Sequence, residues 1–181
     1  MKFTDSRAFT DISHFNRLSD YLPIFNAAIL TDVGGIVLLL SKNIESKYLR
    51  EWYKKYTLSA VIMDVLILVI GAVLARLAYP FFFSSSGFSL IGLAGLAVAI
   101  QITHDILFAV GFNMIPRGKS GIADLFQDYG KEIGVWILVA DAIMMVSTIV
   151  FASLFASLSL HTNILLLIGL VYLVPYLLLS F

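Results

Sequence analysis

Long apolar stretches alternate with short polar segments along the whole chain. Five stretches, at residues 21–40, 57–79, 88–112, 133–156 and 162–181, are mostly apolar. Each is long enough for a helix to cross a hydrocarbon core of about 30 Å, which takes about 20 residues. Because backbone N–H and C=O groups find no partner in lipid, each stretch should be helical. The pattern predicts an all-α protein, a polytopic transmembrane helical bundle of about five spans with short interfacial helices.

The polar segments carry the kinds of side chain found at a membrane surface. We expect residues 1–20 to form an interfacial amphipathic segment and residues 21–181 to form the transmembrane bundle. Tryptophan favours headgroup depth, and lysine and arginine favour anionic headgroups. The residues predicted to contact lipid headgroups are Trp52, Lys54, Lys55, Arg117 and Lys119.

Charge is distributed unevenly among the connections. The two long connections, 41–56 and 113–132, hold most of the basic residues, and with five spans both fall on one side of the membrane. Because lysine and arginine are enriched in cytoplasmic loops, these charged loops are predicted to be cytoplasmic, with the N-terminus outside and the C-terminus inside.

The amino-acid composition limits the kinds of binding partner that the protein is expected to have. Hydrophobic residues make up 60% of the chain and charged residues only 13%, too few to cover a water-facing surface. The 12 Lys and Arg balance the 12 Asp and Glu, so net charge indicates no nucleic-acid partner. The expected partners are the lipid bilayer and either a second copy of the chain or another membrane protein.

One aspartate lies inside each of the first four spans: Asp32, Asp64, Asp105 and Asp141. Each falls about seven to nine residues from the predicted cytoplasmic end, a depth of about 10–14 Å at 1.5 Å per residue. An aspartate at a helix centre costs about 2.5–3.5 kcal/mol on insertion scales, so these side chains should face the bundle interior. Together with His104, they are the candidate residues of an ion or proton pathway.

The order of elements repeats along the chain. The first two spans, and then the next two, each give an Asp-bearing helix, a charged connection and a second Asp-bearing helix. This order is consistent with a parallel repeat of helical hairpins.

Three interpretations of the acidic layer stay open. The carboxyl groups could serve a proton, cation or polar-solute pathway. They could instead hold helices together by hydrogen bonds in a structural or assembly protein of a membrane. In the third, His104 and two or three aspartates bind the metal of a membrane-embedded enzyme, although adjacent His104 and Asp105 point about 100° apart on a helix.

The sequence supports no particular enzyme or cofactor. Gly118, Lys119 and Ser120 imitate the end of a phosphate-binding loop, but position 113, where the motif needs glycine, is Asn113. GxSxG, HExxH and cysteine are all missing, and no span has a lysine for retinal. We therefore expect that the protein is not an enzyme, although the sequence leaves this open. The sequence indicates no cofactor, and it assigns no metal ligand.

The stretches LSAVIMDVLILVIGAVLAR (58–76) and QITHDILFAVGFNMIPRGKSGIADLFQDYGKEIG (101–134) resemble uncharacterised multi-spanning membrane proteins of large DNA viruses of algae and protists. The resemblance covers the middle two-thirds of the chain and includes no diagnostic motif. It implies a protein of the virion's internal membrane or of infected-cell membranes, and it implies no catalytic residue.

Overall fold

The computed structural model describes residues 9–83 and 87–181, and within these ranges the chain is all-α. It contains seven α-helices and one short 3-10 helix, with no strand in the ranges described. The elements are η1 (Leu18–Asp20), α1 (Tyr21–Leu40), α2 (Lys47–Tyr56), α3 (Leu58–Phe83), α4 (Leu90–Met114), α5 (Gly121–Ile133), α6 (Trp136–Phe155) and α7 (Leu160–Leu178). Helices α1, α3, α4, α6 and α7 are long and apolar enough to cross a membrane, which confirms the predicted fold class.

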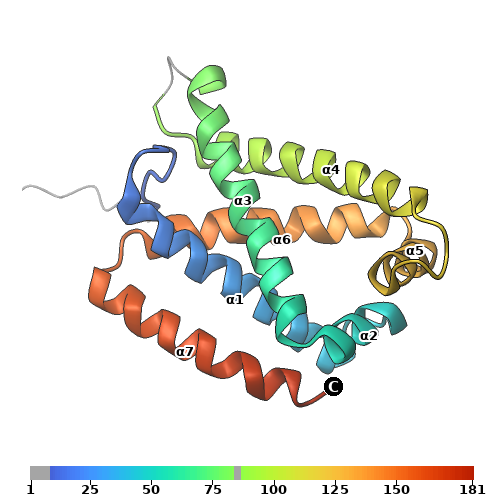
Figure 1. Cartoon of the computed structure of the whole chain (residues 1–181). Helices are drawn as coiled ribbons and strands as arrows, with labels where there is room; N and C mark the ends of the chain where they lie inside the picture. Colours follow the sequence, from blue (N-terminus) through green and yellow to red (C-terminus); the bar gives the residue numbers. More distant parts are fainter. Residues whose placement is uncertain (1–8, 84–86) are drawn as a thin grey trace, which may run out of the picture.

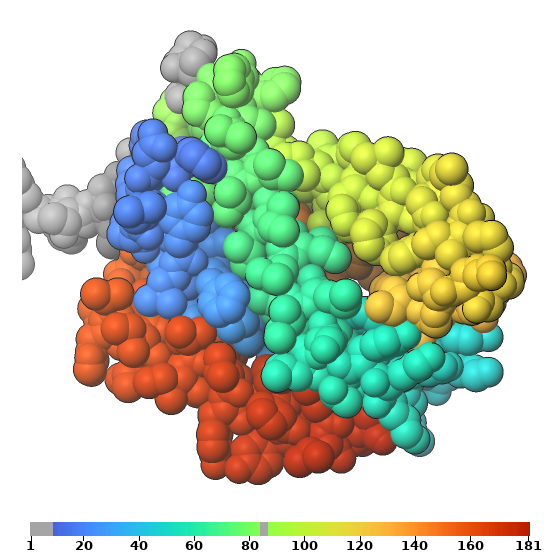
Figure 2. All heavy atoms as spheres, viewed as in Figure 1, coloured from blue at the N-terminus to red at the C-terminus, as the bar shows by residue number. Residues whose placement is uncertain are grey.

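Helix α1 is the central span of the bundle. It packs against α3, α6 and α7, while α4 packs against α3 and α6 (Figure 1). The space-filling view shows α3 running across the molecule between α1 and α4 (Figure 2). A central helix exposes little of its surface to lipid, so polar residues on α1 find partners on other helices.

Two halves of the bundle repeat the same order of elements. Helices α1–α2–α3 and α4–α5–α6 each consist of a span, an amphipathic helix and a second span. The amphipathic helices begin alike, because the side chains of Ser46 and Ser120 accept hydrogen bonds from Leu49 N (3.0 Å) and Ala123 N (3.3 Å). Figure 1 shows α2 and α5 together at one end of the bundle, where they also pack against each other.

The amphipathic helices also end alike. Thr57 follows α2 with a φ of 47°, and Gly134 follows α5 with a φ of 62°. Asp64 and Asp141 each lie seven residues beyond these turns. The predicted repeat of helical hairpins therefore extends to the turns that place two of the four aspartates.

Thr57→Gly should stabilise the protein. A non-glycine residue in this region of positive φ costs on the order of 1–3 kcal/mol, which glycine avoids in the folded state. Glycine also has more freedom in the unfolded chain, so the expected net gain is on the order of 1 kcal/mol, measured as a higher midpoint of denaturant unfolding in detergent. Ser59→Gly is the matched control, because Ser59 lies in α3 and should lose about 0.5–1 kcal/mol. Equal destabilisation by both substitutions would show that Thr57 is not strained.

The predicted boundaries differ most at Pro80, which was expected to begin a connection. Helix α3 instead continues through Pro80 to Phe83. A proline inside a helix removes one backbone hydrogen bond, and packing can outweigh that loss. Here Tyr79 stacks on Phe83 with ring centroids 4.7 Å apart, and its hydroxyl accepts a hydrogen bond from Ser89 N (2.7 Å).

The predicted interfacial segment is described only from residue 9, and residues 9–17 form no helix. The Asp11 carboxylate accepts hydrogen bonds from the backbone N–H and hydroxyl of Ser13, a local turn that competes with helix formation. Thr10 N donates to the Ser153 carbonyl (3.2 Å), and the Ser153 hydroxyl donates to the Thr10 carbonyl (2.6 Å). Ile12 is fully buried, so this part of the segment packs into the bundle end.

Candidate functional site

The Tyr53 hydroxyl lies between the first two intramembrane aspartates. Its oxygen is 2.9 Å from Asp32 Oδ1 on α1 and 3.0 Å from Asp64 Oδ2 on α3. Trp52, the preceding residue on α2, donates its indole N–H to the same Asp64 Oδ2 at 3.0 Å. Helix α2 therefore supplies two donors to the acids of the two spans that flank it in sequence. We call Asp32, Tyr53 and Asp64 the acid–phenol trio.

Two members of the trio are buried, and Asp64 is half-buried. Asp32 is fully buried and Tyr53 is 4% exposed. Burial, followed by the nearby carboxylates of Asp64 and Asp32, raises the pKa of Tyr53 well above its ordinary value. The phenol is therefore neutral at physiological pH and serves as a hydrogen-bonding hydroxyl.

A second tyrosine, Tyr129 on α5, lies near the acids of the other half. Burial is the largest cause that raises its pKa, followed by the charges of Asp141, Asp64 and Glu132. Asp141 in turn lies within electrostatic reach of Asp105 and Asp64. Each amphipathic helix thus brings one tyrosine to the level of the intramembrane acids.

Asp105 makes its hydrogen bonds inside its own helix. It accepts from Gln101 Nε2 at 2.8 Å, and its Oδ1 is 3.1 Å from His104 Nδ1. The His104 ring stacks on Phe108, and its side chain is 36% exposed, so it lies on the more open side of the cluster. Among the residues that the structure describes, no three His, Asp or Glu side chains converge as metal ligands.

Buried polar contacts continue along α1 away from the trio. Thr31 pairs with Thr148 of α6, with hydroxyl oxygens 3.2 Å apart. Five residues nearer the start of α1, Asn26 Nδ2 donates to the Asn163 carbonyl of α7 at 2.9 Å. Thr31 and Asn26 face different helices, α6 and α7, and we call this series of buried polar side chains, which ends at Asp20, the α1 polar column.

An ion pair fills the far end of the α1 polar column. Arg76 of α3 is fully buried, and its Nη2 lies 3.1 Å from Asp20 Oδ2. The same guanidinium donates to the His14 carbonyl and to the Arg17 carbonyl (3.1 Å), and it lies over the Tyr21 ring. Arg76 therefore joins the N-terminal segment to the bundle, a role that hydropathy alone did not suggest.

The predicted headgroup residues have different surroundings. Trp52 is only 3% exposed, and its ring packs against Tyr56 and Phe126 with centroids 4.9 and 5.0 Å away. The structure thus places Trp52 within the protein, because α2 turns its aromatic face toward α3 and α5. Lipid contact stays a prediction for the exposed side chains, which are Lys54, Lys55, Arg117 and Lys119.

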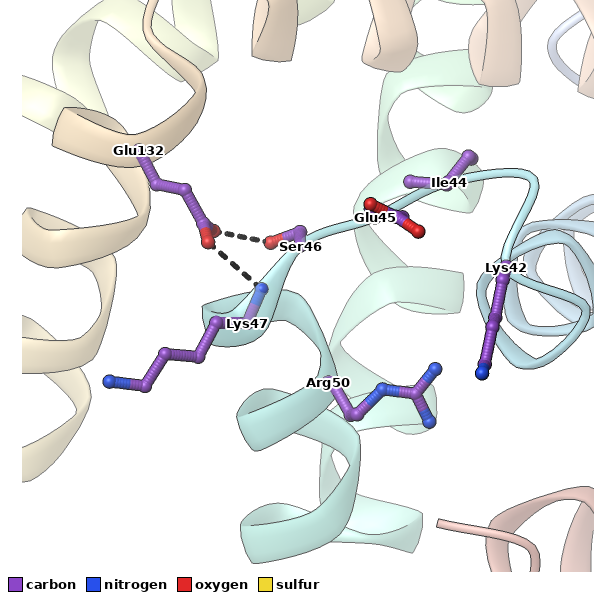
Figure 3. Close-up of a pocket in the computed structure, with 7 residues that line it drawn as sticks. All are labelled: Lys42, Ile44, Glu45, Ser46, Lys47, Arg50 and Glu132. Atoms are coloured by element: carbon purple, nitrogen blue, oxygen red, sulfur yellow. Dashed lines mark hydrogen bonds between the residues drawn. The ribbon is translucent and has the colours of Figure 1, made fainter.

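Glu132 links the end of α5 to the start of α2 by hydrogen bonds that we call the Glu132 clasp. Its carboxylate accepts hydrogen bonds from the Ser46 hydroxyl (2.6 Å), Lys47 N (2.9 Å) and Tyr48 N (3.4 Å). Figure 3 shows this clasp at the edge of an open surface pocket that Lys42 and Arg50 also line. Burial alone would raise the pKa of Glu132, but the hydrogen bonds from Ser46, Lys47 and Tyr48 outweigh it, so the pKa is lowered.

Glu132→Gln should remove a pH-dependent part of the stability. Because the folded-state pKa of Glu132 is lowered, its carboxylate stabilises the fold fully above the unfolded value of about 4.3. That contribution is lost as the pH falls further, through the folded-state pKa. Thermal unfolding in detergent should therefore show a lower midpoint for Glu132→Gln at neutral pH and a smaller fall below about pH 4.3. Parallel pH profiles of the two proteins would contradict the clasp, and Glu51→Gln, an exposed change on α2, is the control.

The fold and its buried acids define an integral membrane protein with five apolar spans. No protein-family model, curated protein or solved structure matches the chain. The resemblance of residues 58–76 and 101–134 to viral membrane proteins therefore stays a prediction, as does the side of the membrane that the charged loops face.

Proposed function

We propose that this membrane protein moves protons along the α1 polar column, entering or leaving through the cluster of intramembrane acids. The observation that carries the proposal is the acid–phenol trio, in which one hydroxyl joins two carboxyl groups from different spans. Ionisable side chains inside a bilayer are costly, and they commonly mark proton relays when they face a bundle interior.

The arrangement of the other polar groups supports the same function. His104 has 36% of its side chain exposed, and its imidazole can both donate and accept a hydrogen, as a proton entry group requires. From the trio, the buried pairs Thr31–Thr148 and Asn26–Asn163 follow α1 toward its other end. The hydroxyl and amide groups at these positions can both donate and accept hydrogen bonds, as the steps of a proton path require.

Proton flux into liposomes tests the proposal. The purified full-length protein is reconstituted with a pH-sensitive dye inside, and a potassium gradient with valinomycin drives protons inward. Asp64→Asn and Asp32→Asn should reduce the flux to that of protein-free liposomes, because an amide cannot accept and release the proton. Glu51→Gln, the same chemical change at an exposed site, should keep the wild-type rate. Wild-type flux at background would contradict the proposal, and sodium or potassium flux in its place would replace the proton with a cation.

A structural role is the second candidate, and a specific observation favours it. Each pair in the α1 polar column joins two different spans, as polar residues that hold membrane helices together do. This role predicts background flux in every variant, with lower thermal stability for Asp64→Asn. The liposome and unfolding measurements on one set of variants therefore separate the two functions.

A further inference from the structure

The acid–phenol trio contains too few hydrogens if both of its carboxyl groups are ionised. The Tyr53 oxygen lies within 3.0 Å of an oxygen of each aspartate, yet a phenol has a single O–H and can donate to only one of them. The other aspartate oxygen would then face the phenol's lone pairs. A second hydrogen, on that carboxyl group, turns this repulsive contact into a hydrogen bond.

We infer that Asp32 and Asp64 share one bound proton, with the acid on Asp32 and the negative charge on Asp64. Asp64 Oδ2 is approached by two donors, the Trp52 indole N–H at 3.0 Å and the Tyr53 hydroxyl. Two donors on one oxygen stabilise a carboxylate. Asp32 then donates its proton from Oδ1 to the Tyr53 oxygen.

The surroundings of Asp32 favour the neutral form. Its side chain is fully buried, and its other oxygen, Oδ2, has no hydrogen-bond partner among the described residues. An ionised carboxylate in such a place would lose its hydration without replacement, whereas the carbonyl oxygen of a neutral acid loses less.

Charges on the neighbouring elements do not reverse this assignment. Helix α5 presents the neutral phenol of Tyr129, and α6 presents the carboxyl group of Asp141, so neither supplies a positive charge that would favour two carboxylates. Arg50 of α2 is engaged elsewhere, because its Nη2 donates to the Leu39 carbonyl (2.9 Å) and its guanidinium lies over the ring of Phe181. That ring is stacked on Tyr53 and lies under the guanidinium.

The trio can pass its proton without changing its composition. Asp32 gives its carboxyl proton to the Tyr53 oxygen while Tyr53 gives its hydroxyl proton to Asp64. The result is an Asp32 carboxylate, an intact phenol and an Asp64 acid, with the same total charge. The use of this exchange in transport rests on the proposed function, whereas the resting protonation state does not.

Infrared spectroscopy tests the protonation state directly. The full chain, labelled with carbon-13 at the aspartate carboxyl groups, is placed in lipid nanodiscs at near-neutral pH, where acid and carboxylate bands are separate. Asp32→Asn should remove acid intensity equal to one carboxyl group, and Asp64→Asn should remove carboxylate intensity instead. Asp124→Asn, outside the spans, is the control and should remove one carboxylate.

Tyr53→Phe is a second test that should not disturb folding, because phenylalanine keeps the ring and removes only the hydroxyl. The variant should keep the intensity of the Asp32 acid band. The band should move to higher frequency, because the acid loses its hydrogen-bond acceptor. An unchanged spectrum of Tyr53→Phe, or a loss of carboxylate on Asp32→Asn, would overturn the inference. The predicted bands in a protein without proton flux would reject the proposed function and keep the shared proton, and flux without those bands would do the opposite.

Discussion

Replacing Arg76 with methionine should lower the free energy of unfolding by about 3–5 kcal/mol, as expected when one member of a buried ion pair is removed. Arg76 is fully buried, and its partner Asp20 is 3% exposed. Methionine would fill much of the space but would leave the Asp20 carboxylate without its cation. The carbonyl groups of His14 and Arg17 would also lose a donor. Denaturant unfolding in detergent, followed by circular dichroism, measures the loss.

Two further variants separate the ion pair from general damage. Asp20→Asn combined with Arg76→Met removes both charges, so it should recover a large part of the stability that Arg76→Met loses. Arg117→Met breaks the exposed pair that Arg117 forms with Asp128 and should have little effect, because water replaces the lost partner. Equal losses for Arg76→Met and Arg117→Met would mean that Arg76 is not buried.

Trp52→Ala should cost about 3–5 kcal/mol, the usual range for a buried aromatic side chain. The ring packs between Tyr56 and Phe126, and its N–H satisfies Asp64. Trp52→Phe keeps most of the packing and loses the hydrogen bond, so it should fall between Trp52→Ala and the wild type. The same detergent unfolding assay measures all of these proteins.

The chain's other tryptophan is a natural control. Trp136 begins α6 and is 68% exposed within the protein. Trp136→Ala should therefore change the free energy of unfolding by no more than about 0.5 kcal/mol, typical of surface positions. If Trp52 contacted headgroups, as its sequence neighbours suggested, Trp52→Ala would behave like Trp136→Ala.

Hydropathy predicted the spans well because each must bury about 20 backbone groups in lipid. Residues 21–40 coincide with α1, and the other four spans differ from prediction by a few residues at each end. The largest correction, at Pro80, arose because stacking of Tyr79 on Phe83 supports one more turn. Local propensity could not include that contact.

The sequence predicted that the aspartates of different spans lie together, but it did not predict their partners. Counting residues from the loops placed Asp32 and Asp64 at one level, where the structure joins them through Tyr53. Tyr53 itself belongs to a connection, and its sequence indicated only membrane-surface affinity. Which face of α2 points inward is set by its packing on α3 and α5. Asp20 was likewise assigned to the interfacial segment, because its partner Arg76 lies 56 residues further along the chain.

The tyrosine between the two aspartates belongs to α2, a helix that lies outside the five spans. Helix α2 has ten residues and packs on α3 and α5, so its position depends on these contacts and not on a span of its own. A displacement of α2 by a fraction of a hydrogen-bond length would change both Tyr53 contacts at once. Any change that moves α2 relative to α1 and α3 should therefore alter the hydrogen bonding of Asp32 and Asp64 together.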